Sequence, residues 1–138
     1  MRKRTHAREF ALQILYQLDI TGDTPENTLH NFWSNRQDEE IDAELQEFSS
    51  ELVAGVAQNR EAIDKKIVQF AQNWQLKRMA VVDRNIMRLG AFELLYREDI
   101  PPKVSINEAV ELAKKFSGVE SGKFVNAILD KIKLEKKK

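Results

Sequence analysis

Apolar residues recur at the spacing of a helix face along almost the whole chain, and the alternation of a half-buried strand is absent. Only five glycines and three prolines interrupt the 138 residues. Apolar side chains three and four residues apart share one face of a helix, and that face must be buried. The sequence therefore predicts an all-α fold of about seven helices in two packed three-helix subdomains, with one helix shared or added. We expect a single domain over residues 1–138, with subdomains of roughly 1–59 and 60–138.

Local signals place several helix ends in the first half of the chain. A first helix should begin near Thr5, and a short one should follow Thr24, because threonine before Pro25 is typical of an N-cap followed by proline at the first helical position. A further apolar pattern runs from about residue 41 to Trp74. A change near Asn59 leaves open whether this stretch forms one helix or two.

Prolines and one glycine punctuate the second half. Pro101 and Pro102 should stop the helix that begins near Arg78, since neither offers an N–H group. Gly90 costs roughly 1 kcal/mol within a helix relative to alanine, which indicates a close helix crossing there. Ser105 followed by Glu108 predicts a capping box. In it, the serine hydroxyl accepts a hydrogen bond from the N–H of Glu108, and the glutamate carboxylate accepts one from the N–H of Ser105.

Charge is balanced overall but unevenly distributed. Lys plus Arg and Asp plus Glu both number 22, so the net charge predicts no partner. Cations dominate the first eight residues and the lysine-rich tail after Asp130, whereas residues 19–51 carry ten acids and one arginine, Arg36. A polyanion should therefore be attracted to the two ends and repelled by the middle.

Several classes of protein are excluded or disfavoured. Cysteine is absent, so disulfides and thiolate chemistry are excluded. No apolar run approaches the roughly 20 residues of a membrane span, and no leader precedes the first helix, so we expect a soluble, cytoplasmic protein. The glycine patterns of phosphate and dinucleotide loops are missing.

Candidate catalytic groups are few. Glu26 and His30 lie one helical turn apart, but two ligands on a short helix are a weak metal signal. The glutamates at 40, 44, 47 and 51 follow one helix face, and we interpret them as a solvated row because no matching cluster appears elsewhere. We therefore expect no enzyme, with no catalytic residue, metal or cofactor.

A basic segment opens the chain and consists of Arg2, Lys3, Arg4 and Arg8. Arg4 and Arg8 lie four residues apart, hence on one side of the first helix. Guanidinium groups suit phosphates because their planar fork donates two parallel hydrogen bonds, and each neutralised phosphate releases counterions. The segment is a candidate for RNA or DNA binding, and the alternative is an ordinary solvated terminus.

Phe124 lies on the shoulder of the apolar stripe of the last helix. On a helical wheel it falls about 80° from the centre of the stripe formed by Val125, Ile128, Leu129 and Ile132. Lys123 and Lys131 lie beside it. An aromatic ring among lysines can stack on an unpaired base, an interaction worth ~1–3 kcal/mol per base. From the wheel alone we favour the alternative, a partly buried core aromatic.

Asp83, Arg84 and Arg88 should occupy the polar side of their helix. Local ion pairing on a wet face is the interpretation we favour, and it contributes little stability. The alternative is a docking surface for another protein.

Two stretches of sequence carry a family resemblance. They are VDRNIMRLGAFELLYREDIPPKVSINEAVELAKKFSGVESGKFVNAILDKI, residues 82–132, and RKRTHAREFALQILYQLD at the start of the chain. Together they resemble the family of the transcription antitermination protein NusB. The resemblance implies an all-helical bacterial protein of two subdomains, which binds boxA RNA of ribosomal RNA leaders as a heterodimer with ribosomal protein NusE. That complex helps RNA polymerase read through terminators.

The resemblance also implies roles for particular residues. The basic segment corresponds to the family's arginine-rich arm, and the KFVN string, residues 123–126, contains the phenylalanine that stacks on an RNA base, here Phe124. Glu120 matches an acidic position near the RNA. Asp83 is implied as a contact to NusE, together with Arg84 and Tyr16.

We therefore expect a non-catalytic RNA-binding antitermination factor. One alternative is an RNA-binding accessory module of a system of the ribosomal RNA methyltransferase type, and another is a protein-only helical scaffold. The sequence leaves open whether the free protein is a monomer or a homodimer.

Overall fold

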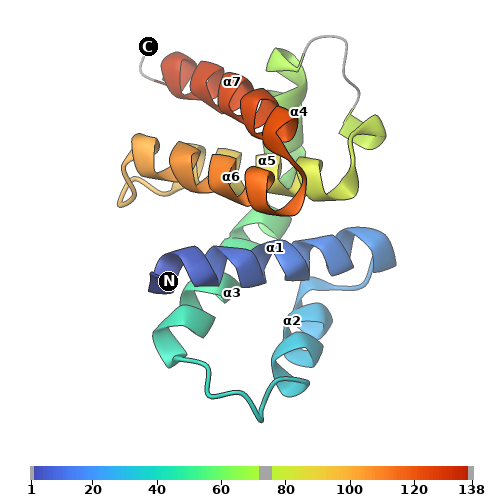
Figure 1. The fold of residues 1–138 in the computed structure, drawn as a ribbon. Helices are drawn as coiled ribbons and strands as arrows, with labels where there is room; N and C mark the ends of the chain where they lie inside the picture. The colour runs from blue at the N-terminus through green and yellow to red at the C-terminus, as the bar shows by residue number, and fades with distance from the viewer. Residues whose placement is uncertain (1, 72–75, 137–138) are drawn as a thin grey trace. The chain divides into compact units, whose positions relative to one another are not determined.

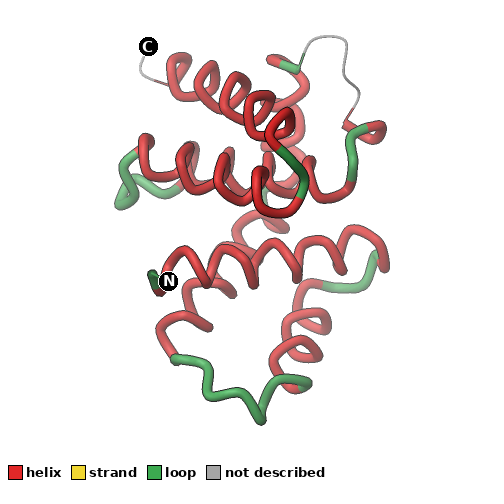
Figure 2. The backbone as a smooth tube through the Cα atoms, viewed as in Figure 1, coloured by secondary structure: helices red, strands yellow, loops and turns green. Residues whose placement is uncertain are grey.

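The structure, a computed structural model, describes residues 2–71 and 76–136 and, except for Lys77, their side chains. Every regular element in these residues is helical (Figures 1 and 2), which confirms the predicted all-α fold. The elements are α1 (Lys3–Thr21), α2 (Pro25–Ser34), α3 (Ala43–Gln58), α4 (Arg60–Phe70), the short 3-10 helix η1 (Leu76–Arg78), α5 (Val81–Tyr96), α6 (Pro102–Phe116) and α7 (Val119–Lys136). No helix in these ranges combines the length and the apolar composition needed to cross a membrane. Trp74 and the terminal Lys137 and Lys138 lie outside the described residues.

The chain forms two compact units, residues 1–58 and 59–138. The first unit holds α1, α2 and α3, and the second holds α4, η1, α5, α6 and α7. The apolar stretch that the sequence left open is two helices, because α3 ends at Gln58 and α4 begins at Arg60. The break between these helices is also the boundary between the units.

Two local caps define the turn between α1 and α2 in the first unit. Gly22 ends α1 with φ +69°, a left-handed conformation that glycine adopts without a Cβ penalty, and its N–H donates to the carbonyl of Leu18 at 2.9 Å. The Thr24 hydroxyl accepts a hydrogen bond of 3.1 Å from the Asn27 N–H, and Pro25 follows it. The N-cap predicted at Thr24 is therefore confirmed.

The core of the first unit joins α1 to both other helices. Phe10 on α1 meets Phe32 and Trp33 on α2 with ring centroids 5.8 and 5.5 Å apart, in edge-to-face geometry. On the other side, the buried Ser49 hydroxyl of α3 donates to the Ala7 carbonyl of α1 at 2.7 Å. These contacts fix the face of α3 that lies against the first turns of α1.

Close packing at Gly90 organises the second unit. A Cβ built on Gly90 would lie 2.6 Å from Cδ1 of Leu129 on α7 and 3.2 Å from Cβ of Ala109 on α6. Because the first distance is shorter than real Cβ contacts allow, a side chain at residue 90 would force the Leu129 side chain to move, and glycine lets α5 lie close to both partners without that shift. The close helix crossing predicted at Gly90 is confirmed.

The capping box predicted at Ser105 and Glu108 is wrong. The helix begins three residues earlier, at Pro102, where the fixed φ of proline suits the first helical position and its missing N–H is not needed. Ser105 is thus inside α6, 1% exposed, and its hydroxyl donates to Oε1 of the buried Glu93 on α5 at 2.8 Å. The serine joins two helices instead of capping one.

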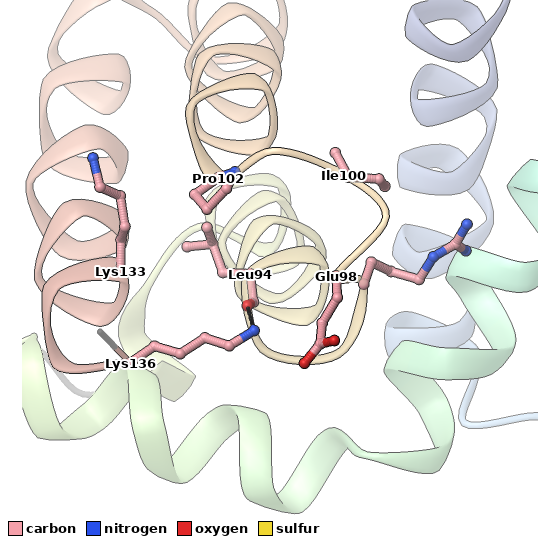
Figure 3. A pocket seen from close by; sticks show the side chains of 7 residues that line it. Leu94, Glu98, Ile100, Pro102, Lys133 and Lys136 are labelled. Carbon is pink, nitrogen blue, oxygen red and sulfur yellow. Dashed lines mark hydrogen bonds between the residues drawn. The ribbon is translucent and has the colours of Figure 1, made fainter. Parts of the chain in front are cut away.

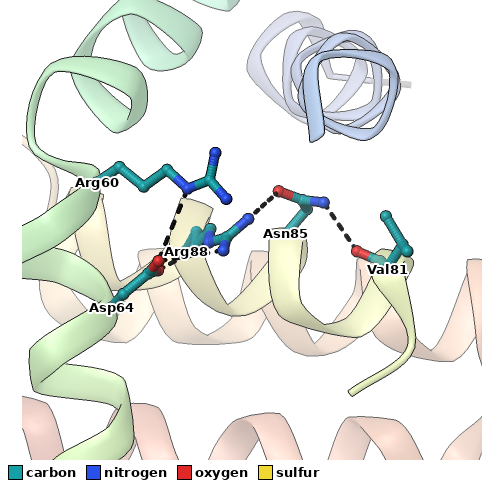
Figure 4. A network of polar contacts seen from close by, with 5 residues as sticks. All are labelled: Arg60, Asp64, Val81, Asn85 and Arg88. Atoms are coloured by element: carbon teal, nitrogen blue, oxygen red, sulfur yellow. Dashed lines mark hydrogen bonds and ion pairs between the residues drawn. The ribbon is translucent and has the colours of Figure 1, made fainter. Parts of the chain in front are cut away.

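Arg88 is not on a wet face, which corrects the interpretation from the sequence. Its side chain is 4% exposed, and Nε and Nη2 donate to the two carboxylate oxygens of Asp64 on α4 at 2.8 and 3.1 Å. Nη1 also contacts the Asn85 amide oxygen at 3.2 Å, and the Asn85 amide donates to the Val81 carbonyl (Figure 4). The helical wheel missed this pair because its acid lies on another helix.

Candidate nucleic-acid interface

The basic segment lies on the first turns of α1, in the first unit. Arg2 is the residue before the helix, and Arg2, Lys3 and Arg4 are exposed. The Lys3 ammonium lies 3.1 Å from the carboxylate of Glu44 and 3.3 Å from that of Asp42, both near the start of α3. The hydrogen bond to Glu44, and to a smaller extent the one to Asp42, raises the pKa of Lys3 above its ordinary value of 10.5. Lys3 is therefore already paired with acids of its own unit.

Arg4 also faces α3. Its guanidinium lies 4.3 Å from the centre of the Phe48 ring, a cation–π contact. A cavity of about 250 Å³ runs beside it, and its lining includes three exposed glutamates of α3, residues 44, 47 and 51. The glutamate row is exposed to solvent, as predicted, but it also sets negative charge next to two cations of the basic segment.

Arg8 differs from the rest of the segment. It is 2% exposed, and its guanidinium lies 5.4 Å from the centre of the Phe48 ring. A guanidinium enclosed in this way does not present its N–H groups to a phosphate. The structure thus gives no support to the direct RNA contact expected for Arg8. Tyr16, further along α1, is 40% exposed.

In the second unit, the first turns of α5 and α7 are joined by hydroxyl groups. Ser121 on α7 donates to Oδ2 of Asp83 on α5 at 3.2 Å and lies 2.8 Å from the hydroxyl of Ser117, which follows α6. Oδ1 of Asp83 is buried and has no hydrogen-bond partner among the described residues. Arg84, the next residue, is half-buried.

The turn before α7 sets the position of these groups. The N–H groups of Ser117 and Gly118 both donate to the Ala113 carbonyl at 2.8 Å, and Gly118 has φ +150°. This conformation closes α6 and lets α7 start at Val119.

Phe124 is half-buried, in agreement with its shoulder position on the helical wheel. It lines a cavity of about 400 Å³ together with Asp83 and Glu120. The remaining lining residues are Arg78, Met79, Ala80 and Ser121. One cavity thus unites residues that the sequence assigned to different partners, since Asp83 was expected to contact a protein and Glu120 and Phe124 to contact RNA.

Two lysines near Phe124 on α7 are exposed. Lys123 is 71% exposed at its side chain and lies 3.5 Å from the Glu120 carboxylate one turn earlier. Lys131 is exposed, and no carboxylate of a described residue lies within ion-pair distance of it. We name Glu120, Lys123, Phe124 and Lys131 the α7 site.

Sequence reasoning missed part of this region. The hydroxyl pair Ser117 and Ser121 has a weak signal, since the two residues are four apart near a helix start. Arg78 and Met79 gave no signal, because their place beside Phe124 depends on how the segment before α5 meets α7.

The chain is similar to known transcription antitermination proteins over most of its length. Two curated relatives are transcription antitermination proteins NusB. The one from Anaeromyxobacter dehalogenans is 49% identical over 130 residues, which cover 94% of this chain and 89% of the relative. The one from Myxococcus xanthus is 48% identical over 133 residues, which cover 96% of this chain and 95% of the relative. Residues 5–133 match the model of the NusB family. The chain therefore belongs to the NusB family of transcription antitermination proteins, as the sequence resemblance predicted.

Solved structures agree with this assignment. NusB of T. maritima has a TM-score of 0.85 and 37% identity, covering 96% of this chain and 91% of that one. A structure of antitermination factors NusB and NusE in complex with dsRNA has the same TM-score and 30% identity, and the alignment covers 98% of both NusB chains.

Proposed function

We propose that this chain is a non-catalytic antitermination factor that binds boxA RNA of ribosomal RNA leaders as a heterodimer with NusE. The observation that carries the proposal is the match, over 98% of the chain, to a NusB seen with NusE and dsRNA. Within the chain, the proposal is supported by an aromatic ring at the edge of a cavity with exposed lysines on the same helix.

The α7 site is the proposed RNA contact of the second unit. Phe124 stacks on an unpaired base, while Lys123 and Lys131 attract phosphates. Glu120 lowers the local positive potential and so tempers affinity. In the first unit, Arg2, Lys3 and Arg4 are the proposed phosphate contacts, and Lys3 and Arg4 must first leave the acids at and near the start of α3.

Asp83 is the proposed centre of the NusE contact. The support within the chain is that Asp83 is half-buried and lines the cavity beside Phe124, where its carboxylate already accepts a hydrogen bond from Ser121. Arg84 beside it and Tyr16 on α1 are the other proposed contacts. The heterodimer then joins the antitermination complex of RNA polymerase in the cytoplasm.

The direct test is a titration of boxA RNA and a scrambled RNA with the full chain, with and without NusE, at two salt concentrations. We expect tighter binding of boxA with NusE present and an affinity that falls as salt rises, because phosphate contacts release counterions. Equal affinity for both RNAs in the presence of NusE would contradict the proposal. Light scattering of the free chain in the same buffers distinguishes a monomer from a homodimer.

A further inference from the structure

A second cavity lies in the second unit, at the opposite end of α7 from Phe124. It has a volume of about 280 Å³ and is lined by Leu94, Arg97, Glu98, Ile100, Pro102, Lys133 and Lys136. Lys136 lies roughly 18 Å along the helix from Phe124, at about 1.5 Å per residue. The cavity is therefore separate from the cavity that Phe124 lines.

The floor of this cavity is apolar. Leu94 at the end of α5 and Ile100 in the following loop are 3% and 4% exposed, and Pro102 starts α6 beside them (Figure 3). The volume falls just below the roughly 300 Å³ at which pockets for small molecules begin. A cavity of this size suits one aliphatic side chain better than a nucleotide.

The edge of the cavity formed by α7 is cationic. The Lys136 ammonium donates a hydrogen bond of 2.6 Å to the Leu94 carbonyl, which is in the last turn of α5 (Figure 3). No carboxylate of a described residue lies within ion-pair distance of Lys136. Among the residues that the structure describes, the one carboxylate within ion-pair distance of Lys133 is that of Asp130, at 3.9 Å. Two ammonium groups are thus held beside an apolar floor with little compensation of their charge.

The loop side of the cavity is less cationic. Arg97 donates from Nε and Nη2 to both carboxylate oxygens of Asp99, at 2.9 and 3.0 Å, so that its charge is balanced locally. Glu98 is the one acid among the described residues that line the cavity. An anionic ligand should therefore approach the lysines of α7 and avoid Glu98.

We propose that this cavity docks a short acidic segment of a partner protein, with one aliphatic side chain on the apolar floor and flanking carboxylates on Lys133 and Lys136. Charge complementarity selects the carboxylates, and the small apolar floor selects an aliphatic side chain over a base. Such a site gives the protein a second protein contact, independent of the RNA and NusE contacts proposed above.

The test uses the full ¹⁵N-labelled chain and three capped pentapeptides: Glu-Glu-Leu-Glu-Glu, Gln-Gln-Leu-Gln-Gln and Glu-Glu-Ala-Glu-Glu. We expect the first to cause saturable shifts of the amide signals of Leu94, Ile100, Lys133 and Lys136, and the other two to bind more weakly. The glutamine peptide measures the contribution of charge, and the alanine peptide measures that of the apolar floor.

Variants of the lining give effects of opposite sign. Lys136→Gln removes the charge but keeps a polar N–H donor at this position, and it should weaken the acidic peptide about fivefold, the loss expected for one ion pair. Glu98→Gln should tighten it about twofold, and Lys65→Gln, an exposed lysine of α4, should leave it unchanged. Melting curves establish that each variant is folded.

Three results would overturn the proposal. The first is equal affinity for the three peptides, and the second is a set of shifts that gathers around Phe124. The third is a loss of RNA affinity in Lys136→Gln as large as the loss of peptide affinity, which would assign the cavity to the RNA surface. None of these results bears on whether the chain binds boxA RNA with NusE.

Discussion

The first turns of α1 and the middle of α5 both carry cations whose surroundings differ from those the sequence predicted. On α1, Lys3 and Arg4 were expected to be open to a polyanion, but they lie beside acids in and just before α3. On α5, Arg88 was expected on a wet face, but it is buried against Asp64 of α4. In both regions the acid comes from another helix, so the pattern of one helix does not reveal whether its cation is available.

The two regions also differ in what their ion pairs contribute. Lys3 and its acids are about half-exposed or more, and such pairs typically contribute up to 1 kcal/mol. The Asp64–Arg88 pair has two parallel hydrogen bonds and an almost fully buried arginine. We infer that the exposed pairs of α1 mainly reduce the local positive charge, whereas the buried pair between α4 and α5 contributes more to the stability of the second unit.

The largest expected effect follows from that difference. Asp64→Ala should lower the free energy of unfolding by about 2–3 kcal/mol, somewhat less than the ~3–5 kcal/mol of a fully buried pair because Asp64 is 23% exposed. Glu44→Ala, which removes an acid from the exposed pair, should change it by less than about 1 kcal/mol. Urea denaturation measures both. Equal losses would show that the buried and exposed pairs are equivalent.

The next effect compares the lysines of the two units in RNA binding. Lys131→Gln should weaken boxA RNA several-fold and lower the slope of affinity against salt by about 0.7–0.9, the value for one phosphate contact. Lys3→Gln should change the slope less, because Lys3 must first give up its acids. Binding curves at several salt concentrations measure the slopes. A larger change for Lys3 would reverse the comparison.

A smaller effect should come from the acids that face the basic segment. Glu44→Gln should increase RNA affinity up to about fivefold at low salt, because an exposed pair of this kind is worth ~0.2–1 kcal/mol. Glu61→Gln changes the net charge equally at an exposed position of α4 and is the matched control. If the RNA affinity of both variants increases equally, net charge alone explains the increase, and the pairing of Glu44 with Lys3 does not lower the RNA affinity of the basic segment.

The smallest effect concerns the titration of Asp42. The hydrogen bond from the Leu45 N–H, followed by the one from Lys3, lowers the pKa of Asp42 below its ordinary value of 3.8. Because the folded pKa is lowered, the stabilisation is present above pH 3.8 and is lost as the pH falls through the lower value. Lys3→Gln should raise the pKa of Asp42 only part of the way to 3.8, because the larger cause, the hydrogen bond from the Leu45 N–H, remains. NMR titration of the carboxyl carbon would detect a full return to 3.8, which would contradict this order of causes.

The fold was more predictable than the site, for physical reasons. The Thr24 cap depends on neighbours within one turn, and a glycine inside an apolar helix implies a close approach whatever the partner. Ser105 was misassigned because the same residue pattern serves a cap or a buried hydrogen bond, and only the position of Glu93 on α5 decides between them. The enclosure of the Arg8 side chain was likewise not predictable, because a helical wheel shows only the residues of one helix.

The central claim is that Phe124 stacks on an RNA base. It is tested most directly by the affinity of Phe124→Ala for boxA RNA with NusE present, compared with Tyr96→Ala, which removes a more exposed aromatic, 43% exposed, from the last residue of α5. We predict a loss of about 1–3 kcal/mol for Phe124→Ala, roughly 5- to 150-fold, and almost none for Tyr96→Ala. Unchanged affinity in a folded Phe124→Ala variant would contradict the account.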